Sequence, residues 1–218
     1  ELGIWVTNAP DSTTNSVAEF TLGAIIAAAK RTFLLNDSLK RRDFYFKNTH
    51  KGADLAGKTL GVVGLGRIGK QVAKKAHYGL DMKIIAYDPF VSQEQAPEYV
   101  QMEDWNTVFE QADFVTLHMP LTKENRGSVG AAEFGRMKRT AFFINCARGE
   151  VVDQEALTAV MREGRIAGAF LDVLDTEPFD LDCPLLSMDN VVVTPHMASN
   201  TEECMMLMAT QAASQICK

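Results

Sequence analysis

The sequence predicts an α/β fold in which a doubly wound parallel sheet lies between two layers of helices. Two observations support this prediction. Along the 218 residues, short β-branched and aliphatic runs alternate with helical stretches, a pattern typical of a parallel sheet covered on both faces. One of these runs, residues 60–63, continues into a glycine-rich turn and then into the helix-forming residues 70–77. We expect a single domain, residues 1–218.

The glycine-rich turn is Gly64-x-Gly66-x-x-Gly69. In this spacing the first glycine permits a tight turn, the second lets a pyrophosphate approach the backbone, and the third lets the helix pack closely on the sheet. The free N–H groups and the positive dipole end of the helix would face the phosphates. Between a strand and a helix, the motif is the dinucleotide-binding fingerprint of Rossmann-type domains. The alternative is a glycine turn in another kind of α/β protein.

An acidic residue in the expected place strengthens this interpretation. Residues 83–87 form the next predicted strand, and Asp88 follows it, 88 − 69 = 19 residues after the last glycine. A carboxylate here would accept hydrogen bonds from an adenosine ribose and repel a 2′-phosphate. The next residues, Pro89-Phe-Val91, offer no arginine to hold such a phosphate. The sequence therefore favours NAD over NADP as the cofactor.

Before the fingerprint, the sequence predicts a short strand at residues 4–7 and then a long helix. Ser16 and Glu19 have the spacing of a capping box that would open this helix. Residues 17–29 are apolar on nearly every face, so the helix lies in a large core or packs on a partner. We favour the partner and expect a homodimer through residues 16–31. Residues 43–57 are expected to form an irregular surface loop.

After the fingerprint, helices and strands continue to alternate. Asp153 is expected to cap one helix and Gly164 to end it, and Thr201 is expected to open a methionine-rich terminal helix. The further predicted helices and strands are helices at residues 104–111, 131–137 and 153–163, and strands at residues 114–117, 141–144, 166–171 and 191–193.

Polar residues follow five of the predicted strands. They are Asp88, His118, Arg148, Asp172 and His196. In a parallel sheet the carboxyl ends of the strands meet at one edge, and ligands bind there. The glycine turn leaves its strand at the same edge. This convergence predicts an active site.

Three residues near this edge could carry the chemistry. His196 is the best acid/base candidate, because imidazole titrates near neutrality; the alternative is a surface or capping histidine. Arg148 could grip a carboxylate through two parallel hydrogen bonds; the alternative is a surface salt bridge. Glu177 lies in the loop after the Asp172 strand, and a carboxylate close to His196 would stabilise the imidazolium and fix its ring; from local sequence alone, a solvated loop acid is the better interpretation.

Composition narrows the function classes. A net charge of −6 offers nothing to a nucleic-acid backbone, and the basic run Lys40-Arg-Arg42 is expected to be a solvated helix face. The four cysteines have no C-x-x-C spacing and no paired histidines, so we expect neither a metal site nor a disulfide framework. The most apolar run, residues 20–29, is too short to span a bilayer. We expect a cytoplasmic protein without a membrane or nucleic-acid partner.

Taken together, these motifs resemble the NAD-binding domain of the D-isomer-specific 2-hydroxyacid dehydrogenases, a family that acts on D-lactate, phosphoglycerate, hydroxypyruvate and glyoxylate. The resemblance covers essentially the whole chain. It rests on eight motifs in the family's order: Asn15-Ser-Val-Ala-Glu19, Gly64-Leu-Gly-Arg-Ile-Gly69, Tyr87-Asp-Pro89, His118-Met-Pro120, Asn145-Cys-Ala-Arg-Gly149, Leu171-Asp-Val173, Glu177-Pro178 and Thr194-Pro-His196.

The resemblance implies residue roles. Arg148 would bind the carboxylate and carbonyl of a small 2-hydroxy or 2-oxo acid, and His196 would exchange a proton with the carbonyl oxygen while Glu177 tunes it. Asp172 would hold the nicotinamide amide. Met197-Ala-Ser199 replaces the glycine-containing turn common in the family. The cofactor-binding set would be Gly64, Gly66, Arg67, Ile68, Gly69, Asp88, His118, Pro120, Cys146, Ala147, Arg148, Asp172, His196, Ala198 and Ser199.

Family members also carry a second, substrate-binding domain, which we expect to be absent from this chain. Residues 1–15 and 201–218 are expected to be cut inter-domain ends, since a strand is already in progress at Glu1 and the last helix runs to Lys218. Two interpretations therefore compete. One is the cofactor domain of a dehydrogenase, weak or inactive by itself because hydride transfer needs a closed, dry cleft. The other is an isolated NAD-binding module or scaffold.

Overall fold

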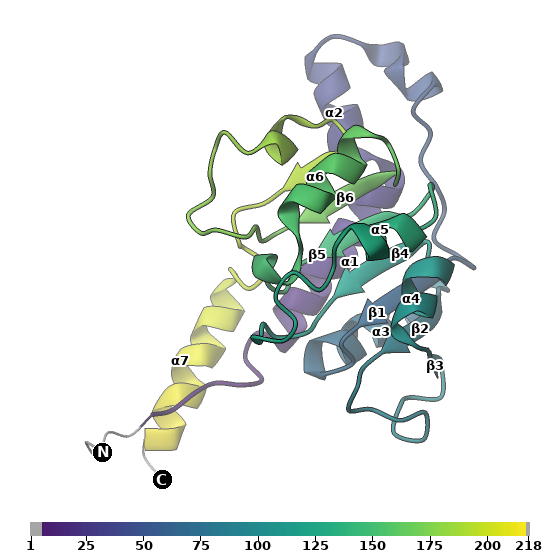
Figure 1. Cartoon of the computed structure of the whole chain (residues 1–218). Coiled ribbons are helices and arrows are strands. Elements are labelled where there is room, and N and C mark those ends of the chain that lie inside the picture. The colour runs from purple at the N-terminus through teal and green to yellow at the C-terminus, as the bar shows by residue number, and fades with distance from the viewer. Residues whose placement is uncertain (1–5, 217–218) are drawn as a thin grey trace.

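The protein is described by a computed structural model of residues 6–216, which form a seven-stranded, all-parallel sheet (Figure 1). The strand order is β3-β2-β1-β4-β5-β6-β7. The predicted α/β fold class is confirmed. The strands are β1 (Thr59–Val63), β2 (Lys83–Tyr87), β3 (Val100–Met102), β4 (Phe114–Leu117), β5 (Phe142–Asn145), β6 (Gly168–Leu171) and β7 (Val191–Val193).

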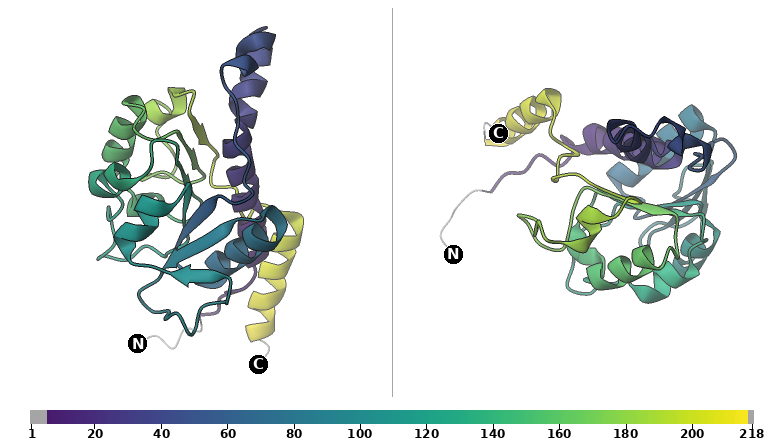
Figure 2. Two further views of the ribbon diagram at one scale, coloured as in Figure 1. Left: turned by 90° about the vertical axis from the view of Figure 1, so that its right-hand side faces the viewer. Right: turned by 90° about the horizontal axis from the view of Figure 1, so that it is seen from above.

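Helices cover both faces of the sheet, as the two turned views show (Figure 2). One apolar core lies between the sheet and α1 (Thr14–Lys30) with α3 (Arg67–Leu80). The other lies between the sheet and α4 (Trp105–Gln111), α5 (Ala131–Arg136) and α6 (Gln154–Arg162). The three-layer arrangement follows from the strands, which are apolar on both sides and bury both.

The order of the strands creates a crevice at the carboxyl edge. Strand β1 pairs with β2 on one side and with β4 on the other, so the chain reverses direction across the sheet between β1 and β4. In open α/β sheets the loops on either side of such a switch point diverge and leave room for a ligand. The glycine turn after β1 and the loop after β4 flank this point.

The long helix begins earlier than predicted and without the predicted cap. Helix α1 starts at Thr14, and its N-cap, Thr13, makes no side-chain capping bond. The capping box at Ser16 and Glu19 is therefore wrong: Ser16 already lies inside the helix, and Glu19 accepts a hydrogen bond from Asn15 at 2.8 Å. Tertiary packing, not a capping box, determines where the helix lies along the sequence, because Ala18 and Ile25 are buried in the chain's own core.

The predicted strand at residues 4–7 is not seen in the part of the chain that the structure describes. Residues 4 and 5 lie outside it, and Val6 and Thr7 belong to no regular element. The edge strand β3 was not predicted, because its three residues give too short a pattern. Its outer edge is covered by Gln93, whose side-chain amide donates to Val100 O and accepts from Met102 N–H.

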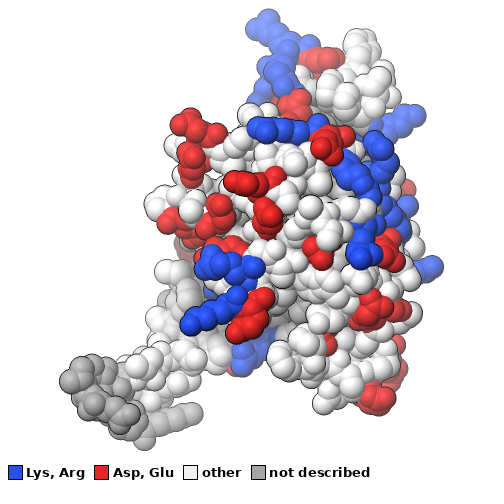
Figure 3. All heavy atoms as spheres, in the orientation of Figure 1, with Lys and Arg blue, Asp and Glu red and all other residues white. Residues whose placement is uncertain are grey.

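A projecting arm follows α1. It consists of α2 (Thr32–Lys40) and the 3₁₀ turn η1 (Phe44–Asn48), and it extends beyond the sheet (Figures 1 and 2). Residues 43–57 are thus irregular as predicted, apart from η1. Basic side chains gather on this arm in the space-filling view (Figure 3). The prediction of a basic helix face holds only for Lys40, because Arg41 and Arg42 lie in the turn after α2.

The remaining elements agree with the predictions within a few residues. Asp104 caps α4 and Asp153 caps α6 through their carboxylates, as expected for the latter. Two further 3₁₀ turns, η2 (Gly149–Val151) and η3 (Pro184–Ser187), lie in the loops after β5 and β6. The last helix is α7 (Glu202–Ile216). None of the helices within residues 6–216 has the length and hydropathy needed to cross a membrane.

Candidate functional site

The turn after β1 has the geometry that the fingerprint predicts. Gly64 has φ +95°, a conformation that L side chains rarely adopt. An added Cβ at Gly64 would also lie 2.8 Å from the carbonyl carbon of His118. At Gly69 an added Cβ would collide with the carbonyl oxygen of Gly64. Glycine at position 64 therefore lets the turn pass close to the β4 loop, and glycine at position 69 lets the start of α3 pack on the turn.

The start of α3 is free to receive an anion. Gly66 is its N-cap, and no described side chain forms a capping hydrogen bond there. An added Cβ at Gly66 would meet nothing within 4 Å, so open space lies in front of this backbone. The first N–H groups of a helix have no intrahelical partner and attract negative charge. The turn and the helix start thus fit a pyrophosphate.

Asp88 lies at the carboxyl end of β2, as predicted, and it fixes the glycine turn. One carboxylate oxygen accepts the N–H of Leu65 at 2.8 Å, and the other accepts the N–H of Phe90 at 2.9 Å. A carboxylate oxygen has two lone pairs, so each can still accept a bond from a ribose hydroxyl. Its ribose contact remains a prediction, but the side chain is held in place for it.

Two cavities meet at this edge of the sheet. The larger, about 610 Å³, is lined by Gly66, Asp88 and the apolar side chains of Phe90 and Trp105, among others. The smaller, about 330 Å³, is lined by Ile68, Arg148, His196 and further residues. Both cavities share three lining residues of the β4 loop: His118, Met119 and Pro120.

The two cavities would suit the two nucleoside halves of a dinucleotide. The larger offers apolar walls and Asp88 for an adenosine, and the smaller lies beside the candidate reactive groups. Gly66 lines the first and Ile68 lines the second, so the backbone of Arg67 lies at the passage between them. A diphosphate joining two nucleoside halves would lie at this passage, over the start of α3.

His118 stands between the cavities as a neutral ring. The surrounding chain desolvates it and lowers the pKa of His118 from its ordinary value of 6.5 to about 3. Its Nε2 lies 3.1 Å from Oγ1 of Thr116, a buried residue of β4. The ring therefore cannot serve as a cation for the phosphates near neutral pH. It can contribute packing and one neutral hydrogen bond to a ligand.

The loop that carries Arg148 is held by Asn145, the last residue of β5. The buried Asn145 amide accepts the N–H of Ala147 at 3.0 Å and donates to the carbonyl oxygen of Arg148 at 2.9 Å. The guanidinium of Arg148 donates from one Nη to Ala147 O at 2.6 Å and is otherwise exposed beside the smaller cavity. Sequence reasoning missed this role of Asn145, although an Asx turn after a strand is a recognisable signal.

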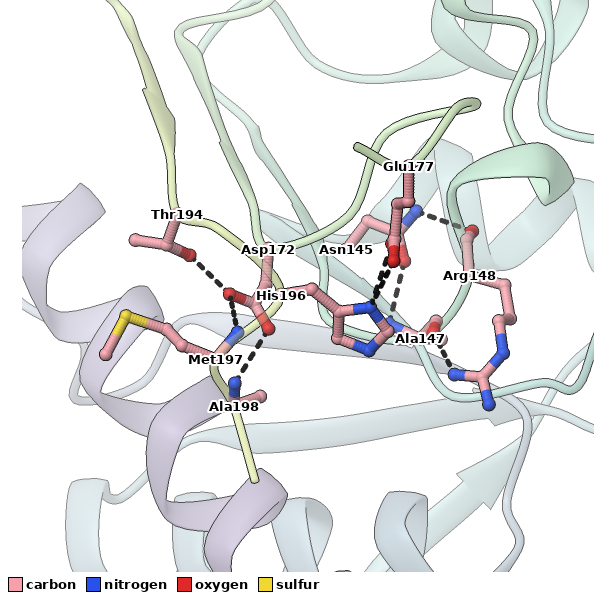
Figure 4. Close-up of polar contacts among 9 residues, drawn as sticks. All are labelled: Asn145, Ala147, Arg148, Asp172, Glu177, Thr194, His196, Met197 and Ala198. Carbon is pink, nitrogen blue, oxygen red and sulfur yellow. Dashed lines mark hydrogen bonds and ion pairs between the residues drawn. The ribbon is translucent and has the colours of Figure 1, made fainter. Parts of the chain in front are cut away.

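His196 and Glu177 face one another across two loops (Figure 4). The Nδ1 atom of His196 lies 2.8 Å and 2.9 Å from the two carboxylate oxygens of Glu177. Their side chains are 42% and 43% exposed, so the pair is open to solvent and to ligands. Because Nδ1 is engaged, Nε2 is the atom that His196 can present to a substrate. The predicted proximity of Glu177 to His196 is what the structure shows.

Asp172 organises the loop that presents His196 (Figure 4). Its carboxylate is fully buried and accepts three bonds: from Thr194 Oγ1 at 2.5 Å, Met197 N–H at 2.9 Å and Ala198 N–H at 2.8 Å. In addition, its backbone carbonyl accepts the N–H of His196 at 2.9 Å. The predicted contact with a nicotinamide amide stays a prediction, and one acceptor position of four is left for it.

Cys146 lines the smaller cavity but is not suited to nucleophilic chemistry. Burial raises the pKa of the Cys146 thiol to about 12, so it stays protonated. Ala147, Ala198 and Ser199 line the same cavity. Across the described part of the chain, no three His, Cys, Asp or Glu side chains are placed to hold a metal ion. Most of the predicted site residues therefore line one of two adjoining cavities. Arg67, Gly69, Asp172 and Glu177 line neither: Asp172 is buried, and Glu177 is placed beside the smaller cavity by its contact with His196.

Comparison with known proteins shows to which protein family the chain is similar. The family described as "D-isomer specific 2-hydroxyacid dehydrogenase, NAD binding domain" matches residues 22–198. A D-3-phosphoglycerate dehydrogenase of Methanocaldococcus jannaschii is 46% identical over 220 aligned residues, which cover 100% of this chain and 41% of that protein. The chain thus spans about two fifths of the length of this relative.

Solved structures show the same fold. A D-2-hydroxyisocaproate dehydrogenase is 29% identical with a TM-score of 0.93, over 99% of this chain and 68% of that chain. A D-isomer-specific 2-hydroxyacid dehydrogenase from Lactobacillus delbrueckii ssp. bulgaricus, in its NAD-complexed form, is 31% identical with a TM-score of 0.86. This match covers 96% of the chain described here and 67% of the other.

Proposed function

Because the chain belongs to the D-isomer-specific 2-hydroxyacid dehydrogenases, as their NAD-binding domain, we propose that it serves the interconversion of a D-2-hydroxy acid and its 2-oxo acid. The observation that carries the proposal is the placement of the His196–Glu177 pair and Arg148 around the cavity that adjoins the coenzyme cradle. A module that only binds a nucleotide would need neither an acid/base pair nor a free guanidinium at this place.

The bound coenzyme supplies or accepts the hydride. The chain's own residues bind it: the start of α3 faces the diphosphate, Asp88 receives the ribose hydroxyls, and Phe90 and Trp105 offer apolar surface to the adenine. The carboxylate of Asp88 also opposes a 2′-phosphate, which supports NAD over NADP. Ile68 and Ala198, which line the smaller cavity, would offer apolar surface to the nicotinamide.

His196 moves the proton. With Nδ1 turned to Glu177, the protonated ring gives its Nε2 proton to the substrate carbonyl oxygen in reduction, and the neutral ring takes a hydroxyl proton in oxidation. The Glu177 carboxylate, bound at Nδ1, fixes the plane of the ring and turns Nε2 to the substrate. Arg148 binds the substrate carboxylate, since its guanidinium keeps donors that Ala147 O does not occupy.

A low rate is expected of the 218-residue chain by itself, since Arg148, Glu177 and His196 are all exposed to solvent. The competing proposal is a coenzyme-binding module with no turnover. Measured reduction of 2-oxo acids separates the two, because a module would give none with any substrate while a dehydrogenase domain would give a slow rate that is lost in His196→Ala.

We also propose a homodimer and a cytoplasmic location. The inner face of α1 packs on the chain's own core, whereas Ile26 of α1 is 39% exposed and Phe33 of α2 is 44% exposed. This apolar surface supports dimerisation through residues 16–31 and the arm that follows. The thiols of Cys146, Cys183 and Cys204 are buried and free, which supports a reducing compartment.

Titration with NADH, followed by fluorescence, tests the proposal. The wild-type chain should bind NADH; Asp88→Ala should weaken binding by about tenfold or more, the scale of a lost charged hydrogen bond. His196→Ala should bind NADH almost normally while losing all turnover. A wild-type chain that fails to bind NADH would refute the proposal. If His196→Ala unfolds the chain, the histidine is structural and its role as acid/base is wrong.

A further inference from the structure

An ion pair lies at the start of α3, next in sequence to residues that line the two cavities. The guanidinium Nε of Arg67, the first residue of α3, lies 2.9 Å from Oδ1 of Asp11, which belongs to the turn before α1. The sequence neighbours of both residues line the two cavities. Gly66 and Ile68, which flank Arg67, line the larger and the smaller cavity, and Thr13, two positions after Asp11, lines the smaller one. The pair therefore lies where the proposed coenzyme would carry its two phosphates.

The ion pair between Arg67 and Asp11 is weak enough for another anion to replace Asp11. Both side chains are largely exposed, 63% for Arg67 and 65% for Asp11, so water screens their attraction and ordering either side chain has an entropic cost. Nothing else in the described part of the chain is paired with either charge. A diphosphate at the start of α3 would present two negative charges to the same guanidinium, together with acceptor oxygens suited to its fork of donors.

We propose that Asp11 is a built-in competitor of the coenzyme phosphates for Arg67. In the free chain Asp11 occupies the guanidinium and lowers the positive potential at the start of α3. Binding of the coenzyme transfers Arg67 to the diphosphate and releases the Asp11 carboxylate to solvent. Asp11 thereby weakens coenzyme binding. This inference rests on the proposed function.

The experiment compares NADH binding in wild type, Asp11→Asn and a matched control. Asp54→Asn is the control, because Asp54 is also an exposed aspartate paired with one cation, Lys30. Unlike Arg67, Lys30 is the last residue of α1, and neither it nor its chain neighbours line either cavity. Asp11→Asn should bind NADH about two- to fivefold more tightly, as expected for one exposed charge pair. Asp54→Asn should bind as wild type does. The gain should shrink between about 50 mM and about 500 mM NaCl.

Two further arms identify the cause. In an Arg67→Gln background, Asp11→Asn should change NADH affinity no more than the control does. With ADP-ribose, which keeps the diphosphate, the gain should persist, and with adenosine, which lacks it, there should be none. Equal or weaker NADH binding by Asp11→Asn, or an equal gain in Asp54→Asn, would overturn this proposal alone. Absence of NADH binding in wild type would overturn the proposed function as well.

Discussion

At the scale of the residue, environment decides what each histidine of the site can do. His118 is packed into the chain beside Thr116, and desolvation holds it neutral. His196 is open to solvent and paired with a carboxylate, an arrangement that lets an imidazole carry a proton. Both follow strands, and the sequence singled out His196 as the acid/base candidate without giving the surroundings of either ring. Only the second has the surroundings of a proton carrier.

The lowered pKa of His118 predicts a pH dependence of stability. Between pH 6.5 and about 3, the unfolded chain binds a proton at this residue and the folded chain does not. Unfolding is therefore favoured as the pH falls below 6.5, and the stabilisation that a neutral His118 allows is lost progressively toward pH 3. Urea unfolding at about pH 7.5 and about pH 5 should show a smaller loss of stability in His118→Asn than in wild type.

The pH range above 7.5 is the control for comparing wild type with His118→Asn. Above pH 7.5 both forms of the chain hold a neutral residue 118, so the two proteins should respond alike to a further rise in pH. A loss between about pH 7.5 and about pH 5 that is the same in wild type and variant would show that the ring is accessible to protons in the folded state.

At the scale of the element, the loops after the strands are positioned by buried polar side chains at the strand ends. Asn145 at the end of β5 holds the Arg148 loop, and Asp172 after β6 holds the His196 loop. Each uses backbone N–H or C=O groups that would otherwise lack a partner next to the core. Such a side chain ties the backbone of the loop to the rigid edge of the sheet and so fixes the loop conformation.

Removing the amide of Asn145 should therefore cost more than an ordinary polar truncation. Asn145→Ala leaves the Ala147 N–H and the Arg148 carbonyl without their partner, so we expect a loss of about 1–3 kcal/mol in the free energy of unfolding. The matched control is Asn36→Ala on the exposed part of α2, which should change stability by less than about 0.5 kcal/mol. Denaturant unfolding measures both. Equal effects would show that the Arg148 loop is held by something else.

At the scale of the whole molecule, the parallel sheet brings the residues of the site together at one edge. The carboxyl ends of β1, β2, β4, β5, β6 and β7 all open to the same edge, where two cavities lie side by side. Helix α2 extends beyond the sheet (Figure 2), and Ile26 of α1 and Phe33 and Leu39 of α2 are exposed apolar residues. The site and the proposed dimer surface are thus separate features of one fold.

The dimer proposal is tested by light scattering coupled to size-exclusion chromatography. Wild type should elute with twice the monomer mass, and Ile26→Glu should shift the chain toward the monomer because it places a charge on the outer face of α1. Leu181→Glu is the control, since Leu181 is an exposed apolar residue in the loop after β6. A monomeric wild type, or dissociation by Leu181→Glu alone, would contradict dimerisation through α1.

The sequence by itself determined the fold class, the glycine turn and the residues at the strand ends. These features depend on local patterns: apolar runs of strand length, φ-permissive glycines and carboxylates at helix starts, as at Asp153. It erred at Ser16, because a motif with capping spacing does not begin a helix whose register is set by burial.

Only the tertiary structure decided which distant residues meet. Glu177 contacts His196, which is 19 positions further along the chain. The Asp172 carboxylate accepts hydrogen bonds from the loop after β7, and Asp11 forms an ion pair with Arg67. No periodicity records such pairs, because they depend on how separate loops pack above one sheet edge. Periodicity determines which face a residue occupies, whereas the packing of the loops determines which side chains come within bonding distance.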